Sequence, residues 1–231
     1  MDKYIDPKIL QHYENYNSVY YSGALGFFEN WAHNSLERYQ SESLHQKILD
    51  VGGGDGQHVA FVSRTFNQYT ILDILDHSKN PNSGISIDNL KKLQFIKGNA
   101  EKLPFKDEKF DRVILTCILH HVDSPDSVLK ECRRVLRNGG VLSIYLPCDP
   151  GLVYRWIRHF MAHMKYAKKT KQNISSVKYL WALEHKNHVL GLSTLIKEIF
   201  SADIVKKVNY PFRIGSWNIN LFKIYQITLV K

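Results

Sequence analysis

Four glycines and two carboxylates occur together in the run Ile48-Leu49-Asp50-Val51-Gly52-Gly53-Gly54-Asp55-Gly56. A strand that ends in glycines before a helix lets the backbone turn sharply, and it presents unpaired N–H groups to a ligand. The dinucleotide-binding pattern G-x-G-x-x-G would need a third glycine where this chain has Gln57. Negative charge at Asp50 and Asp55 would repel a pyrophosphate but could neutralise an ammonium group. The run therefore favours a zwitterionic ligand that carries a cation, with a purely structural turn as the alternative.

Two further polar segments follow the next two expected strands. Asp73 closes the second strand, where an acid can accept both hydroxyls of a ribose, and Asp76 is the alternative if that strand is longer. After the third strand, the run 97–105 offers polar side chains and backbone N–H groups that suit the edge of a nucleobase. Leu75 would supply an apolar face for the same base.

His120 and His121 follow the fourth expected strand, at the carboxyl edge where ligands bind in parallel sheets. We predict that His121, or failing it His120, orients or deprotonates a bound substrate that acts as a nucleophile and accepts a transferred group. The alternative is that one of them packs or hydrogen-bonds beside a cofactor. Cys117 and Cys148 lack the remaining pattern of a thiolate-dependent cytosine methylase, so we interpret them as buried or loop cysteines.

Strand and helix alternate between residues 47 and 146, which indicates right-handed crossovers and a parallel sheet covered on both faces. Strands are predicted at 47–51, 69–75, 93–97, 110–117, 141–146, 203–210 and 221–230. Helices are predicted at 8–40, with a break at Gly23 and Gly26, and at 57–66, 127–136 and 151–200.

These runs together resemble the class I S-adenosylmethionine-dependent methyltransferases, the broad group that includes the ubiquinone-biosynthesis C-methyltransferases. The matching segments are 48–56, 99–105, 109–115, 119–122 and 131–142. The resemblance implies a Rossmann-like α/β fold with a seven-stranded, mostly parallel sheet, an antiparallel last strand and a helical insert between strands five and six. Asn99 departs from the family, which usually has Asp at this position, although its amide oxygen can still meet an adenine amino group.

The resemblance also implies S-adenosyl-L-methionine as cofactor and S-adenosyl-L-homocysteine as product. Asp50 and the glycines would hold the methionine moiety, Asp73 the ribose, and Asn99 with Ala100 the adenine. The full set of expected cofactor contacts is Asp50, Gly52, Gly53, Gly54, Asp55, Gly56, Asp73, Ile74, Leu75, Asn99, Ala100, Glu101, Thr116 and Cys117.

Residues 151–200 interrupt the sheet where this family usually places acceptor-recognition elements. Expected acceptor contacts are Tyr20, Tyr21, Trp156, His159, His185 and His188; core packing of these aromatic residues is the alternative. His185 and His188 could share a helical face, but no third ligand is evident beside them, so no metal site is expected. We expect one domain over 1–231, with an N-terminal helical lid (1–46), a cofactor-binding core (47–150), an acceptor-recognition insert (151–200) and a C-terminal strand pair (201–231).

Composition restricts the possible classes of protein. Hydrophobic residues make up 44% and charged residues 23% of the 231, which excludes wholesale disorder and coiled coil. Apolar runs fall short of the ~20 residues that span a membrane. Three cysteines without C-x-x-C spacing, and a start without an apolar signal core, predict a cytoplasmic protein.

Charge is uneven, because residues 151–231 carry 14 basic and 3 acidic side chains. This segment either faces an anionic partner or simply keeps the surface soluble. We therefore predict methyl transfer to a small or medium-sized, anionic or lipid-linked acceptor through oxygen or nitrogen. An RNA methyltransferase and a non-catalytic S-adenosylmethionine-binding protein are the alternatives; the oligomeric state is left open.

Overall fold

The computed structural model describes residues 23–39 and 46–231. Its sheet has seven strands in the order β3-β2-β1-β4-β5-β7-β6. Their bounds are β1 (Lys47–Val51), β2 (Gln68–Asp73), β3 (Leu93–Lys97), β4 (Phe110–Thr116), β5 (Leu136–Pro147), β6 (Ile204–Tyr210) and β7 (Phe222–Thr228). Neighbouring strands from β3 to β5 pair in parallel, whereas β7 pairs antiparallel with both β5 and β6. The expected fold, with an antiparallel last strand, is confirmed.

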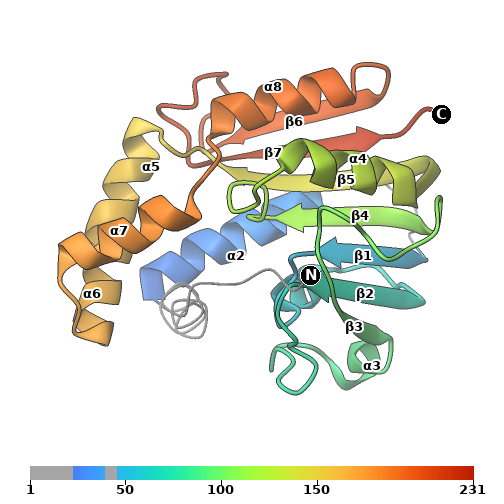
Figure 1. Ribbon diagram of the computed structural model, residues 1–231, viewed down its shortest axis with the longest axis horizontal. Helices are drawn as coiled ribbons and strands as arrows, with labels where there is room; N and C mark the ends of the chain where they lie inside the picture. The colour runs from blue at the N-terminus through green and yellow to red at the C-terminus, as the bar shows by residue number, and fades with distance from the viewer. Residues whose placement is uncertain (1–22, 40–45) are drawn as a thin grey trace.

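Helices cover both faces of this sheet. Their bounds are α2 (Gly23–Arg38), η1 (Gln57–Phe61), α3 (Ile87–Leu90), α4 (Pro125–Val135), α5 (Leu152–Ile157), η2 (Arg158–His163), α6 (Met164–Thr170), α7 (Ile174–Glu184) and α8 (Val189–Ile199). One apolar core joins the sheet to α4 and α8, and a second joins its other face to α2 and η1. Figure 1 shows α4 and α8 in front of the sheet and α2 behind it.

Of the helices between β5 and β6, those from α5 to α7 form a separate group at one end of the sheet, whereas α8 packs on the sheet itself. Figure 1 shows α5, α6 and α7 together at the left, where the β4 arrow points. Ala162, Tyr166, Val177 and Trp181 are buried there in a third apolar cluster, which also includes Leu25 of α2. The α2 helix therefore connects the sheet to this helical group, and the predicted insert between strands five and six is confirmed.

Several local predictions differ from the structure, including that of β5, which begins at Leu136 and not at the predicted residue 141. The helix expected over 57–66 is only a 3₁₀ turn, because Val62 is already extended and Phe66 returns to the core beside Tyr69. Gly26 does not break a helix; α2 begins at Gly23 and continues through Gly26, whose burial offsets the ~1 kcal/mol that glycine costs a helix. The expected first helix over residues 8–22 lies outside the described residues.

A buried polar network fixes α2 to the sheet. Arg112 of β4 is fully buried and donates to Glu37 of α2 at 2.7 Å and to Ser143 of β5 at 2.9 Å. His58 lies 2.9 Å from the same Glu37 oxygen. Burial opposes ionisation of Glu37, but Arg112 and His58 outweigh it and lower its pKa from 4.5 to about 2.

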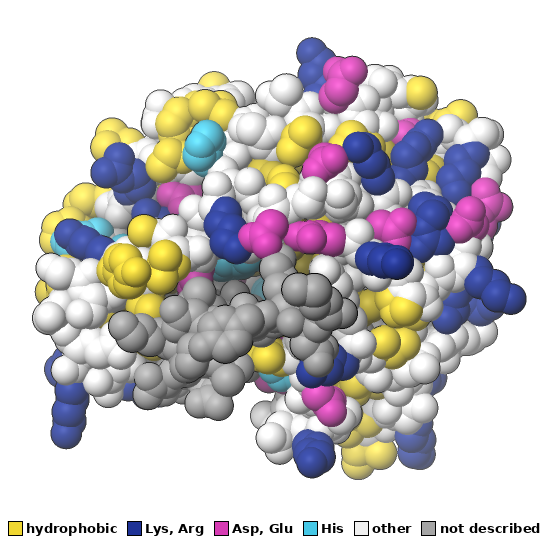
Figure 2. Space-filling model, viewed as in Figure 1, with side chains coloured by type: hydrophobic (Ala, Val, Ile, Leu, Met, Phe, Trp, Pro, Cys, Tyr) yellow, Lys and Arg dark blue, Asp and Glu magenta, His cyan; other side chains and the backbone are white. Residues whose placement is uncertain are grey.

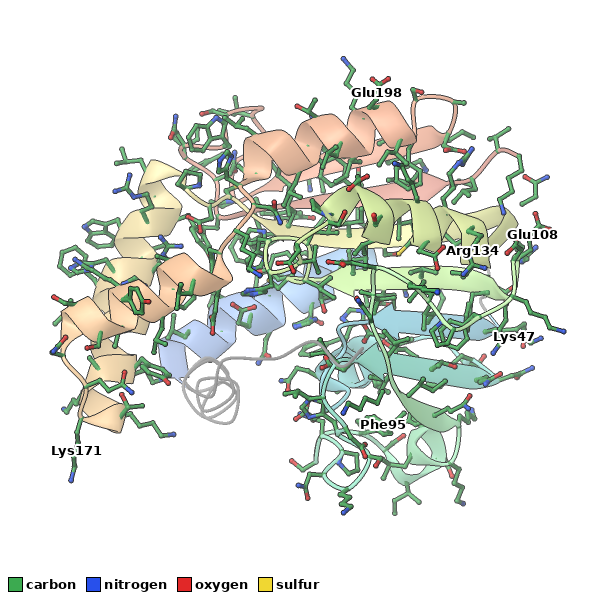
Figure 3. The ribbon with its side chains drawn as sticks, viewed as in Figure 1. Lys47, Phe95, Glu108, Arg134, Lys171 and Glu198 are labelled. Carbon is green, nitrogen blue, oxygen red and sulfur yellow. The ribbon has the colours of Figure 1, made fainter. Side chains whose placement is uncertain are left out.

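We predict that Glu37→Gln destabilises the protein by about 3 kcal/mol at pH 7, because it leaves the Arg112 charge buried without its counter-charge. Since the folded-state pKa of Glu37 is depressed, its contribution is present above pH ~4.5 and is lost as the pH falls toward 2. Urea unfolding measures both effects. Glu198→Gln, on the outer side of α8 (Figure 3), should change stability by less than about 0.5 kcal/mol. Equal stability of the two variants would contradict the assignment.

Candidate active site

The glycine run forms a tight turn between β1 and η1. Gly52, Gly54 and Gly56 have φ values of 72°, 53° and 91°, a region that favours glycine. At Gly53 the reason for glycine is different, because an added Cβ would lie only 2.7 Å from the Asp50 carboxyl carbon. The turn therefore folds its backbone directly over the Asp50 side chain.

Asp50 is completely buried at the end of β1. Tyr69 of β2 donates a hydrogen bond to its Oδ2 at 2.9 Å, while Oδ1 has no partner among the residues that the structure describes. Burial raises the pKa of Asp50, and nearby His58 and the Tyr69 hydroxyl oppose that rise. A cation bound over this turn would stabilise the ionised carboxylate.

Asp73 lies at the end of β2 and faces the same turn. Its carboxylate accepts hydrogen bonds from the backbone N–H groups of Gly54, at 3.1 Å, and Leu75, at 3.0 Å. Asp76 is exposed and instead accepts the N–H of Ser78. A small pocket opens beside Asp73, lined by Gly54, Ile71, Asp73, Leu75, Asp76, His77, Phe95, Ile96 and Lys97. Phe95, labelled in Figure 3, contributes to this lining from β3.

The remaining predicted cofactor residues lie in three nearby segments. Asp55 is half-buried next to Asn82, and Ile74 follows β2. After β3, Ala100 is buried and Asn99 is exposed, with its side-chain oxygen accepting the Glu101 N–H at 2.9 Å.

The Glu101 carboxylate binds the backbone N–H groups of Asp123 and Ser124, at the start of α4. Thr116 ends β4, and Cys117 follows it with a φ of 54°; burial raises the pKa of its thiol. The two hydrogen bonds to the start of α4 give Glu101 a structural role that sequence spacing did not indicate.

The turn after β4 brings the histidines against the glycine turn. Ile118 fills the space that a Cβ on Gly52 would need, and it accepts the backbone N–H of His121 at 2.9 Å. His120 and His121 have ring centroids 3.9 Å apart, and His185, at the end of α7, is 4.5 Å from His120. Burial and the neighbouring rings lower the pKa of His120 well below its usual value, so its imidazole is uncharged at neutral pH.

The other predicted acceptor residues do not join this cluster. Trp156 is exposed and contacts Phe160, His159 is half-buried on η2, and His188 is exposed before α8. Tyr20 and Tyr21 lie outside the described residues. Sequence reasoning missed Asp149, which accepts hydrogen bonds from His185 Nδ1 at 2.7 Å and from Arg158 at 2.5 Å. Nothing in the spacing of these three residues indicates that they meet.

Comparison with known proteins agrees with this geometry. A family profile described as a methyltransferase domain matches residues 49–144. The chain is 27% identical to a demethylmenaquinone methyltransferase of Lactobacillus johnsonii over 87% of this chain and 83% of that protein. It is 31% identical to the ubiquinone/menaquinone biosynthesis C-methyltransferase UbiE of Bartonella tribocorum, but over only 55% of this chain and 51% of the relative.

The N-methyltransferase NodS of Bradyrhizobium japonicum, solved with S-adenosyl-L-homocysteine, shares the fold. Its TM-score is 0.58 at 14% identity, with 87% of each chain covered. Sheet order, glycine turn and family match together define a class I methyltransferase. The matched domain and the fold support an S-adenosylmethionine-dependent methyltransferase, with S-adenosyl-L-methionine as its cofactor.

The residues present fit this cofactor. The buried Asp50 Oδ1 lacks a partner within the described part of the chain, and the glycine turn above it leaves open space where a Gly54 side chain would stand. Asp73 and the pocket lined by Leu75 and Phe95 suit a ribose and a flat base beyond it. Whether each predicted residue contacts the cofactor stays a prediction.

We predict that Gly53→Ala weakens binding of S-adenosyl-L-homocysteine by at least about tenfold, since the new methyl must displace the Asp50 carboxyl or the turn. Isothermal titration calorimetry measures the affinity. Gly191→Ala is the matched control, because its Cβ would meet nothing within 4 Å and lies on α8. Unchanged affinity in Gly53→Ala would contradict a cofactor site built on this turn.

Proposed function

We propose that the enzyme methylates a small acceptor that carries an ionisable ring hydroxyl, of the phenol or hydroquinone type. The observation that carries this proposal is the histidine cluster at the carboxyl end of β4, in a turn whose Ile118 packs against Gly52 of the glycine turn. Deprotonation of such a hydroxyl makes both its oxygen and the adjacent ring carbon nucleophilic. Transfer to the oxygen agrees with the sequence-based prediction of an oxygen or nitrogen nucleophile, and transfer to the ring carbon agrees with the quinone-related names of two relatives.

The bound cofactor supplies an electrophilic methyl group on a sulfonium. Asp50, the glycine turn and Asp73 would hold it, so that its reactive end lies toward the turn after β4. The chain's main contribution is then alignment of acceptor and methyl donor, which is worth roughly 7–11 kcal/mol at most. Residues 151–188 would cover the acceptor and exclude water from it.

We propose that His121 acts on the acceptor hydroxyl. Its Nδ1 lies 3.2 Å from the backbone oxygen of Glu184, which favours a proton on Nδ1 and makes Nε2 the unprotonated nitrogen. In this arrangement Nε2 would accept the acceptor's proton or fix its hydroxyl by a hydrogen bond. His120 packs against the His121 ring at an interplanar angle of 41° and limits its rotation.

Transfer of a labelled methyl group from S-adenosyl-L-methionine to a panel of acceptors tests this function. Naphthohydroquinone and simple phenols should be methylated, whereas their O-blocked ethers should not react. Methylation of amines or RNA alone would overturn the proposal.

We predict that His121→Ala lowers kcat by about 100-fold or more, because the acceptor hydroxyl loses the group that orients or deprotonates it. Steady-state rates from pH 6 to 9 measure the effect, and unchanged affinity for S-adenosyl-L-homocysteine shows that the variant remains folded. Turnover at the wild-type rate across this pH range would remove His121 from the mechanism.

An exposed apolar stripe indicates how a poorly soluble acceptor reaches the site. Leu152, Trp156, Phe160 and Met164 are 71%, 62%, 51% and 49% exposed, at four-residue intervals along α5, η2 and α6. Arg155, Lys168 and Lys169 are exposed on the same helices. Figure 2 shows apolar and basic side chains together over this end of the molecule. In the part of the chain that the structure describes, no helix could itself cross a bilayer.

We therefore propose that this stripe docks on an anionic lipid surface. Apolar side chains at a membrane boundary, flanked by Lys and Arg, bind by burial and by attraction to anionic headgroups. The basic excess of residues 151–231 gives the charge complementarity that this partner requires. Such docking would place the helical group over a lipid-soluble acceptor.

We predict that the double variant Trp156→Ser, Phe160→Ser binds phosphatidylglycerol-containing vesicles at least about tenfold more weakly than the wild type. Vesicle co-sedimentation measures this binding. Phe212→Ser removes an equally exposed aromatic ring from the β6–β7 connection and should bind normally. Equal loss in both variants, or equal binding to neutral vesicles, would contradict docking through the stripe.

A further inference from the structure

The histidine cluster has the composition of a metal site. His120, His121 and His185 each offer a ring nitrogen, and these three atoms lie within 4.8 Å of one another. The rings come from two segments 63 or more residues apart in sequence, the turn after β4 and the end of α7. Sequence spacing suggested that His185 shares a helical face with His188, whereas the fold brings His185 next to His120 and His121.

Hydrogen bonds to the outer nitrogens orient two of these rings. His185 Nδ1 lies 2.7 Å from the buried Asp149 carboxylate, and His121 Nδ1 lies 3.2 Å from the Glu184 carbonyl. Metal-binding histidines almost always donate their other N–H to a carboxylate or a carbonyl, which makes Nε2 the ligand atom. Arg158 contacts the same Asp149 oxygen at 2.5 Å, so it holds that carboxylate in place.

His120 supplies a third and independent indication. Its side chain is 4% exposed, and its Nδ1 is buried with no hydrogen-bond partner among the described residues. A buried polar atom left in this way costs roughly 1–3 kcal/mol unless something binds it. A cation between the three rings would remove this cost.

We propose that His120, His121 and His185 bind a divalent transition metal ion, with Zn²⁺ as the preferred ion. Three imidazoles without a carboxylate in the ligand set favour Zn²⁺, Co²⁺ or Ni²⁺ over the oxygen-seeking Mg²⁺ and Ca²⁺. A tetrahedral Zn²⁺ holds its nitrogen ligands roughly 3.4 Å apart, so binding closes the rings inward by side-chain rotation. Three protein ligands leave a fourth position open.

The open position on the metal ion would bind the hydroxyl oxygen of the acceptor. Ile118, in the turn that carries His120 and His121, packs against Gly52, so a metal ion at the cluster would stand close to the cofactor turn. A phenol bound there loses its proton more readily, because a cation stabilises the phenolate. In the metal-bound form the histidines act through the ion and not directly on the acceptor. This last step rests on the proposed function, whereas metal binding itself does not.

Metal titration without any acceptor tests the site. Full-length protein freed of metal by a chelator is titrated with Zn²⁺ against a chromophoric competitor, and with Co²⁺ while visible absorption is recorded. We expect one equivalent per chain and a Co²⁺ spectrum of low coordination number. His185→Ala should weaken Zn²⁺ binding by at least about 100-fold, and Asp149→Asn by about 10- to 100-fold.

His188→Ala is the matched control, because it removes an exposed histidine only three residues from His185 and should bind Zn²⁺ normally. S-adenosyl-L-homocysteine affinity confirms that each variant is folded. Equal Zn²⁺ affinity in the wild type and His185→Ala, or weak binding of several equivalents, would overturn the site. Stoichiometric Zn²⁺ without methylation of any phenol would retain the site and reject the proposed acceptor.

Discussion

The close contact between Gly53 and the Asp50 carboxyl is the constraint on which the site depends. It lets the backbone after β1 pass directly over a buried carboxylate, and no larger residue fits there. Because β1 pairs with β2 on one side and β4 on the other, the same turn is held between Asp73 and the turn that carries His120. Its position sets the distance between a bound cofactor and the histidine cluster.

Buried polar and charged groups have different roles behind the sheet and at its carboxyl edge. Behind the sheet, Arg112, Glu37 and His58 pair with one another and attach α2, although Glu37 Oε2 and Arg112 Nη1 have no hydrogen-bond partner among the described residues. At the carboxyl edge, Asp50 and His120 each retain a buried polar atom with no partner among the described residues. The first arrangement stabilises the fold, whereas the second leaves binding capacity for ligands.

Sequence patterns predicted the parts of the molecule that local chemistry determines. The apolar run of β4, the glycine spacing after β1 and the alternation of elements gave the sheet and the cofactor edge. Strand β2 ends at Asp73, two residues before the predicted limit, and the helix expected after Gly56 is a single 3₁₀ turn. Both differences arise where tertiary contacts of Phe66 and Asp73 override local preference.

Contacts between side chains that lie far apart in the sequence could not be predicted in this way. Asp149 and Arg158 meet His185 only because η2 and α7 pack against each other at the sheet end. Tyr69 reaches Asp50 across neighbouring strands, and Glu101 turns to the start of α4. Trp156, expected to contact the acceptor, faces solvent because the buried side of its helical group consists of Ala162, Tyr166 and their neighbours.

A crystal structure of the protein with S-adenosyl-L-homocysteine tests the central claim most directly. The account predicts the amino-acid end over Asp50 and the glycine turn, the ribose at Asp73 and the sulfur directed toward His120 and His121. A product bound elsewhere, or with its sulfur directed away from the histidines, would contradict it.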